Sequence, residues 1–68
     1  MDFVCRCYLK DGKTKDGNNK RITVETYIDN NVGVTFFVVY TCDKGMLQSF
    51  INKKFKLLSE AIYYYDTL

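Results

Sequence analysis

The stretch that decides the fold is Val32-Gly33-Val34-Thr35-Phe36-Phe37-Val38-Val39-Tyr40-Thr41. Successive side chains of a strand point to opposite faces, and here both sets of alternate positions are largely apolar. A strand with this pattern is covered on both faces, so residues 32–41 are predicted to form the central strand of a sheet. The pattern leaves two registers open, with either Phe36 and Tyr40 or Phe37 and Val39 on the less covered face.

Two further strands are predicted before this stretch, over residues 3–9 and 20–28, because apolar and polar residues alternate in both. Asp29-Asn30-Asn31 separates the second of them from the central strand. Two Asp-Gly pairs, Asp11-Gly12 and Asp16-Gly17, lie between the first and the second. Asp, Asn and Gly accept the backbone angles of turns, so the three strands are expected to follow one another as antiparallel hairpins.

The chain after the central strand allows two interpretations. Cys42-Asp43-Lys44-Gly45 is typical of a tight hairpin turn and predicts a fourth strand over residues 46–52. Apolar residues between Leu47 and Tyr65 also recur at helical spacing, which would start a helix near Met46.

Both interpretations end in a helix over residues 59–67. Ser59 is the expected N-cap, and Glu60 suits the positive end of the helix dipole. One stripe is predicted to pack on the sheet, formed by Ala61, Ile62, Tyr65 and Leu68. The order of the elements predicts an α+β fold, a small antiparallel sheet of three or four strands with one C-terminal helix on one face. The chain is predicted to be a single domain over residues 1–68.

The residue types argue against catalysis. The chain contains no His, which removes the commonest general base and the commonest metal ligand. Its carboxylates fall mostly in turns and near the ends, so a paired acid and base is not expected. We therefore predict a non-enzyme that needs neither a cofactor nor a metal.

The sequence also predicts a cytoplasmic protein, in the host cytosol if a phage encodes it. The N-terminus lacks the apolar core of a secretory signal, and no apolar run is long enough to cross a membrane. Three Cys is an odd number, which does not suit a secreted disulfide scaffold. The opening Met predicts a complete small open reading frame.

The cysteines are predicted to be core residues. Cys5 and Cys7 share the parity of Phe3 and Leu9, and a buried free Cys behaves as a small hydrophobic side chain. A zinc site is disfavoured because Cys42 lies far along the chain and only one close pair of thiols exists.

The uncovered sheet face is the best clue to function. Its candidate partner-binding residues are Arg6, Tyr8, Arg21 and Tyr27. Tyr and Arg are the usual anchors of protein interfaces, and aromatic rings interleaved with Arg also stack on bases and hold phosphates. Ordinary cross-strand packing is the third interpretation.

Two clusters near the C-terminus are secondary candidates. The candidate phosphate contacts are Lys44, Lys53, Lys54 and Lys56, unless they form a plain solvated junction. Tyr63-Tyr64-Tyr65 cannot all face the sheet from one helix, so Tyr63 and Tyr64 are candidates for partner contacts.

Residues 55–64, Phe55-Lys56-Leu57-Leu58-Ser59-Glu60-Ala61-Ile62-Tyr63-Tyr64, resemble a junction in small β-β-β-α DNA-binding domains. These are the arm-binding domains of tyrosine integrases and the plant AP2-type domains, where a strand ends in an aromatic residue and the helix opens with Glu-Ala. The resemblance implies DNA binding by the sheet face. The residues it implicates are Arg6, Tyr8, Arg21 and Tyr27. The glycines and the tryptophan of the plant family are missing, and the face holds few cations.

In size, sheet-plus-helix build and missing catalytic groups the chain is also similar to phage and mobile-element inhibitors such as anti-CRISPR proteins. That resemblance has no motif behind it, and it implies binding to a host nuclease or defence complex. Ten Lys and Arg stand against eight Asp and Glu, and this near-neutral balance favours a protein partner over nucleic acid. Exposed sheet edges without Pro also predict a two-fold homodimer.

Overall fold

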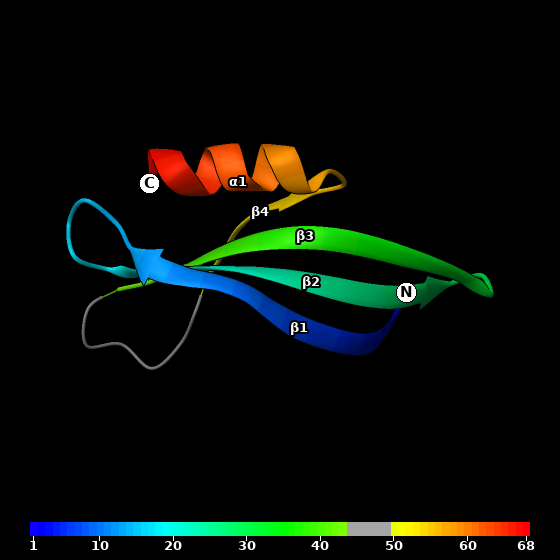
Figure 1. Ribbon diagram of the computed structural model, residues 1–68. Coiled ribbons are helices and arrows are strands. Elements are labelled where there is room, and N and C mark those ends of the chain that lie inside the picture. Colours follow the sequence, from blue (N-terminus) through cyan, green and yellow to red (C-terminus); the bar gives the residue numbers. More distant parts are fainter. Residues whose placement is uncertain (44–49) are drawn as a thin grey trace.

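The structure is a computed structural model that describes residues 1–43 and 50–68, with the backbone alone at residues 50–52. It consists of a four-stranded antiparallel sheet and one C-terminal helix (Figure 1). The elements in chain order are β1 (Asp2–Lys13), β2 (Asn19–Asp29), β3 (Val32–Cys42), β4 (Phe50–Phe55) and α1 (Leu58–Thr67). The predicted α+β fold is confirmed.

The strands lie in the sheet in the order in which they occur in the chain, β1-β2-β3-β4. The predicted inner position of residues 32–41 is confirmed, because β3 lies between β2 and β4; β2 is the second inner strand. The strand predicted over residues 46–52 corresponds to β4, which extends to Phe55, and the part of the predicted strand before residue 50 falls outside the described residues. A helix starting near Met46 is wrong, since β4 occupies the middle of that range.

The turn between β2 and β3 follows from its two asparagines. Asn30 and Asn31 have φ of 51° and 64°, the pair of positive values that a two-residue hairpin turn needs. Residues 14–18 close the β1–β2 loop, where the Asn18 amide donates to the Thr14 hydroxyl at 3.1 Å and Gly17 has φ of 85°. The predicted turn at Asp29-Asn30-Asn31 and the antiparallel order of the strands are confirmed, but Asp11-Gly12 is not part of the loop, because β1 continues to Lys13 and pairs these residues with Arg21 and Lys20.

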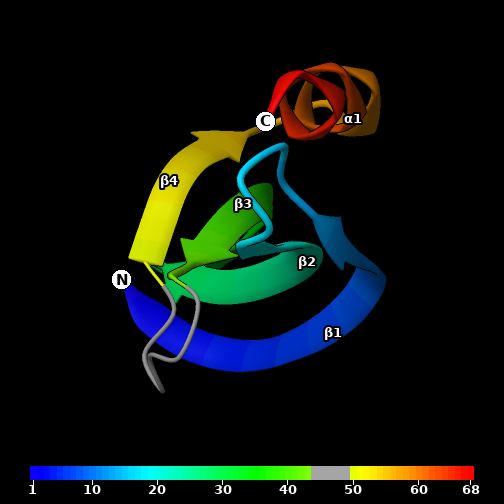
Figure 2. The same cartoon turned by 90° about the vertical axis from the view of Figure 1, so that its left-hand side faces the viewer.

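The helix packs on one face of the sheet (Figures 1 and 2). Ile22 of β2 and Val39 of β3 meet Ala61 and Tyr65 of α1, and all four are almost fully buried. This cluster confirms the predicted contacts of Ala61 and Tyr65 and places Leu68 against them. Ile62 is 37% exposed, so its predicted place in the core is wrong.

The helix begins at Leu58, one residue before the predicted start. The N-cap is Leu57, which makes no side-chain capping bond, and the predicted cap Ser59 lies inside the first turn. Lys20 of β2 helps hold the C-terminal end of α1, because its Nζ donates to the Tyr65 carbonyl at 2.8 Å. Among the described residues no helix is long and apolar enough to span a membrane.

Strand β1 is an edge strand and departs from the prediction for its side chains. Cys5 and Cys7 are exposed, not buried, because α1 packs on β2, β3 and β4 and leaves much of β1 uncovered. Register shifts between Phe3 and Cys5 and between Tyr8 and Lys10 insert an extra residue at two points. As a result Phe3 no longer shares a face with Cys5 and Cys7, and the predicted alternation over 3–9 is broken.

Gly12 is placed where only a hydrogen fits. A Cβ at this position would collide with the hydroxyl of the buried Tyr65, whose Cζ atom would be 3.3 Å away. We expect Gly12→Ala to lower the free energy of unfolding by about 1–3 kcal/mol, as overpacking does. Gly33→Ala is the matched control, since Gly33 has nothing within 4 Å and lies in β3. Equal urea midpoints for the two variants would contradict the close fit of Tyr65 on β1.

Candidate functional site

The sheet face turned away from the helix is called the open face here. Strand pairing assigns to it Phe3, Arg6, Tyr8 and Asp11 of β1, Arg21, Thr23, Glu25 and Tyr27 of β2, Phe36, Val38 and Tyr40 of β3, and Lys54 of β4. This settles the register that the sequence leaves open, with Phe36 and Tyr40 on the open face and Phe37 and Val39 beneath the helix. The predicted residues Arg6, Tyr8, Arg21 and Tyr27 all lie together on it.

Glu25 is the centre of the open face. Its side chain is fully buried, although the helix lies on the other side of the sheet. The carboxylate accepts hydrogen bonds from four side chains on β1, β2 and β3, which are Arg6 (Nε, 3.0 Å), Thr23 (3.1 Å), Tyr27 and Tyr40. Buried charges persist in proteins when they are paired and hydrogen-bonded, and this network meets both conditions.

The network also shifts the pKa values of Glu25 and of its tyrosine partners in opposite directions. Burial alone would raise the pKa of the Glu25 carboxyl, but the hydrogen bonds from Tyr27 and Tyr40 and the charge of Arg6 outweigh burial and hold that pKa below its ordinary value. Burial and the bond to Glu25 raise the pKa of Tyr40 to about 12. The ionised carboxylate and the neutral phenols are therefore the forms that suit the fold.

We expect the stability of the fold to fall at both ends of the pH scale. A carboxyl group whose pKa is depressed in the folded state stabilises that state above its unfolded pKa, and this contribution is lost as the pH falls through the folded pKa. The raised pKa of Tyr40 works in the other sense, because its contribution is lost as the pH rises from about 10 towards 12. Urea midpoints for the wild type should thus drop in acid below about pH 4.5. The matched variant Glu25→Gln should show a flatter acid limb, and parallel acid limbs would contradict the role given to Glu25.

Aromatic rings and cations cover the buried carboxylate. Phe3, Tyr27 and Phe36 form an edge-to-face row across β1, β2 and β3, with centroids 5.6 and 6.0 Å apart. The Arg6 guanidinium lies 5.4 Å from the Phe3 ring and 5.7 Å from the Tyr40 ring. These contacts let a sheet face that no helix covers keep Glu25 away from water.

The second arginine of the open face is paired in the same way. Arg21 Nε donates to the Asp11 carboxylate at 2.6 Å, and its guanidinium lies 4.3 Å from the ring of Tyr8. Tyr8 itself is 65% exposed. Both predicted arginines are thus bound to carboxylates of the neighbouring strand, and the ring of Tyr8 is what the face offers to solvent at this point.

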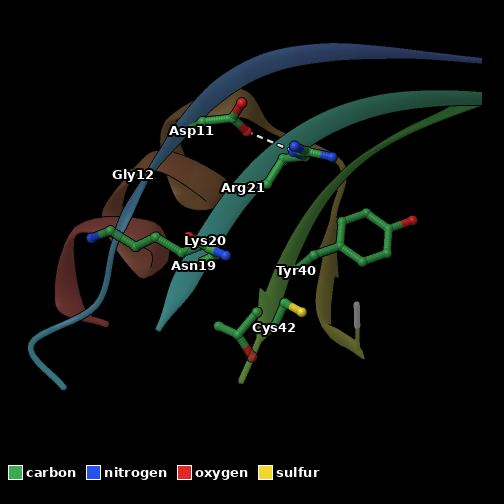
Figure 3. A pocket seen from close by; sticks show the side chains of 8 residues that line it. Asp11, Gly12, Asn19, Lys20, Arg21, Tyr40 and Cys42 are labelled. Carbon is green, nitrogen blue, oxygen red and sulfur yellow. Dashed lines mark hydrogen bonds and ion pairs between the residues drawn. The ribbon is translucent and has the colours of Figure 1, made fainter. Parts of the chain in front are cut away.

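A hollow of about 380 Å³ adjoins this ion pair, where β1, β2 and β3 approach the loops (Figure 3). Lys20 and Arg21 extend to opposite sides of β2 there, with Lys20 reaching the helix and Arg21 reaching Asp11. The described lining is mainly polar and holds an ion pair. It lacks the apolar walls typical of small-molecule sites.

The remaining predicted residues are divided between the two faces of the sheet. Tyr63 is 75% exposed on α1, and Tyr64 packs beside Phe55 with centroids 5.6 Å apart, so both lie on the helix side. The lysine cluster is divided, because Lys53 lies over the rings of Phe55 and Tyr64. Lys54 lies 5.3 Å from Tyr27 and 5.5 Å from Phe36, and Lys56 lies 5.7 Å from Phe36. Lys44 falls outside the described residues.

The alternation of residues 20–28 places Glu25 on the same face as Arg21 and Tyr27, but the sequence prediction gave it no role. One signal was available in the sequence. Glu25 lies in the middle of residues 20–28, and the other side chains on its face of that strand are those of Arg21, Thr23 and Tyr27. The bonds from Tyr40 and the row through Phe3 and Phe36 could not be foreseen. They depend on the β3 register and on the extra residue near Phe3.

The described residues hold no group of three or more His, Cys, Asp or Glu side chains arranged to bind a metal. No family model, curated protein or solved structure matches the chain. The open face, with its buried carboxylate and its exposed rings, is therefore the feature from which a function is inferred.

Proposed function

We propose that this protein is a non-catalytic binding module that recognises another protein through the open face. The observation that carries the proposal is that both arginines of this face are paired with carboxylates, Arg6 with Glu25 and Arg21 with Asp11. Their charges are balanced within the face, and their donors are directed at neighbouring strands. Phosphate binding instead relies on cations that displace counterions.

The exposed rings of the same face suit a protein partner. Tyr8 and Phe3 are 65% and 53% exposed and stand on a strand. Arg21 under Tyr8 and Arg6 beside Phe3 hold these rings in place. Rigid aromatic side chains lose little freedom on binding, which is why such residues dominate the energy of protein interfaces.

The finer part of the proposal is an inhibitory role, as a phage or mobile-element protein that occupies a host nuclease or defence complex. It is supported by the similarity to anti-CRISPR proteins in size and build, and by the absence of His from the whole chain. A protein of this kind acts by covering a surface, for which an ordered aromatic face is sufficient.

Nucleic acid is the second candidate partner, and one observation favours it. Lys54 and Lys56 lie beside the rings of Tyr27 and Phe36 at the β4 side of the open face. A backbone phosphate near these amines with a base against the rings would follow the usual mode of single-strand binding.

Salt dependence separates the two candidates. We expect the protein to bind mixed-sequence single-stranded and duplex oligonucleotides only weakly at physiological salt, which fluorescence anisotropy measures directly. The protein-binding proposal would be contradicted by oligonucleotide binding that is tight at about 50 mM salt and weakens steeply towards about 200 mM. In that case Lys54→Ala should also reduce the slope of log affinity against log salt concentration by about one. Lys15→Ala is the matched control, since Lys15 is an exposed cation of the β1–β2 loop, away from the open face.

A further inference from the structure

The outer edge of β1 is the longest exposed strand edge among the described strands. β1 spans twelve residues and pairs with β2 along one side only. Four of its apolar side chains, Phe3, Val4, Tyr8 and Leu9, are 48–65% exposed. An edge of this kind presents a row of backbone N–H and C=O groups that another strand can bind.

The sequence of β1 is self-complementary when it runs antiparallel to itself about Arg6. In that register Asp2 faces Lys10, Phe3 faces Leu9, Val4 faces Tyr8 and Cys5 faces Cys7. Each pair is either apolar or oppositely charged, and cross-strand pairs of both kinds stabilise sheets. A slip by one residue would set Asp2 against Asp11 in one direction, or Asp2 against Leu9 and Cys5 against Arg6 in the other, and a slip by two would set Phe3 against Asp11 or Val4 against Arg6.

We infer that β1 pairs with β1 of a second copy in this register, joining two sheets across a two-fold axis at Arg6. The two Arg6 side chains do not confront each other, because each is drawn toward its own β2 by the 3.0 Å bond to Glu25. The stretch from Cys5 to Tyr8 is free of register shifts and forms the centre of the contact. The two extra residues, Val4 and Leu9, lie on either side of it and meet Tyr8 and Phe3 of the second copy.

This arrangement explains features that the single chain leaves without a role. Cys5 and Cys7 lie on the helix-side face of an exposed edge, and in the dimer they face one another across the axis. Both open faces would lie on the same side of one continuous sheet. The inference does not rest on the proposed function, because it follows from the backbone edge of β1 and the order of its residues, although Phe3 and Tyr8 also belong to the open face.

Cysteine cross-linking tests the register directly. In a Cys42→Ser background, Cys7→Ser keeps only Cys5 and Cys5→Ser keeps only Cys7. Directly opposite residues have Cβ atoms about 4.5–5.5 Å apart, close enough for a disulfide, whereas identical residues are diagonal at about 7–8 Å. We expect mild oxidation of an equal mixture to give about tenfold more covalent dimer than either variant alone, because only the mixture holds a facing pair.

Three outcomes would overturn the inference. Equal cross-linking in all three samples would indicate random collisions of exposed thiols. Cross-linking of one variant with itself would indicate another register. A mass that stays at the 8.0 kDa of the chain at all concentrations in sedimentation equilibrium would exclude a dimer. The cysteine variants leave the open face unchanged, so their failure would not affect the proposed function.

A charge exchange supplies a second, independent readout. Asp2→Lys and Lys10→Glu should each raise the dissociation constant of the dimer about threefold or more, since each substitution puts like charges opposite one another. The double variant should restore the dissociation constant measured by sedimentation. Failure of the double variant to restore it would contradict the facing of Asp2 and Lys10.

Discussion

Glu25→Ala is expected to leave most of the protein unfolded at neutral pH. The substitution removes the acceptor of four hydrogen bonds, so that the Arg6 guanidinium and three hydroxyl groups lose their partner. The Arg6 side chain is 42% exposed and can be hydrated, but the buried hydroxyls of Thr23 and Tyr40 lose their acceptor, at a cost of about 1–3 kcal/mol for each. The whole free energy of unfolding of a 68-residue chain is about 3–10 kcal/mol, so the loss is comparable with the total. Circular dichroism and urea unfolding measure it.

Two variants serve as controls for this result. Glu25→Gln keeps the size of the side chain and one acceptor oxygen, and should lose only about 1–3 kcal/mol. Glu60→Ala removes an exposed carboxylate from the first turn of α1 and should change the free energy of unfolding by less than about 1 kcal/mol. If Glu25→Ala unfolds at the same urea concentration as Glu60→Ala, the network does not stabilise the open face.

Tyr65→Ala should cost nearly as much, through packing and not through charge. The Tyr65 ring is 3% exposed and joins α1 to Ile22 and Val39. The amines of Lys20 and Lys10 lie 4.2 and 5.0 Å from its centroid. Truncating a buried aromatic ring costs about 3–5 kcal/mol, and the helix has few other fully buried side chains to keep it on the sheet.

The half-exposed Ile62 provides the matched control on the same helix. Ile62→Ala should change the free energy of unfolding by less than about 1 kcal/mol, and Tyr65→Phe, which keeps the ring, should remain close to the wild type. Amide exchange should show α1 losing protection selectively in Tyr65→Ala. Equal losses for Tyr65→Ala and Ile62→Ala would contradict the packing described for α1.

The strands and the helix could be predicted from the sequence because local patterns determine them. The apolar run of residues 32–41 requires cover on both faces, and Asn30-Asn31 requires a tight turn; both features are present in β3 and its hairpin. The position of β4 was less accessible, since apolar residues after Gly45 fit helical spacing as well as a strand.

The burial of β1 could not be predicted, because it depends on where the helix lies. Alternation predicts that Cys5 and Cys7 share a face, and they do. Nothing in β1 says that α1 will pack on the other three strands. The register shifts near Val4 and Leu9 also change the side of Phe3, and such shifts leave no clear trace in the residue types.

The candidate residues of the open face were foreseen as a group but not as a network. Arg6, Tyr8, Arg21 and Tyr27 were selected for their chemistry, and strand pairing brings them together. The ion pairs of Arg6 and Arg21 depend on cross-strand neighbours, which the sequence gives only once the register is known. Tyr63 and Tyr64 were selected because three consecutive tyrosines on a helix cannot all face the sheet, and the structure places them on the helix side, apart from the open face, with Tyr63 75% exposed.

Affinity capture with the open-face variant Tyr8→Ala tests the central claim most directly. The immobilised protein is exposed to bacterial lysates with and without nuclease treatment, beside Tyr8→Ala and the matched variant Tyr63→Ala on the opposite side of the sheet. A hot-spot tyrosine contributes about 2 kcal/mol or more, or about thirtyfold in affinity. We expect a protein that survives nuclease treatment to be retained by the wild type and by Tyr63→Ala, and to be lost with Tyr8→Ala. Recovery of nucleic acid alone, or equal recovery by all three proteins, would contradict the claim that the open face binds a protein.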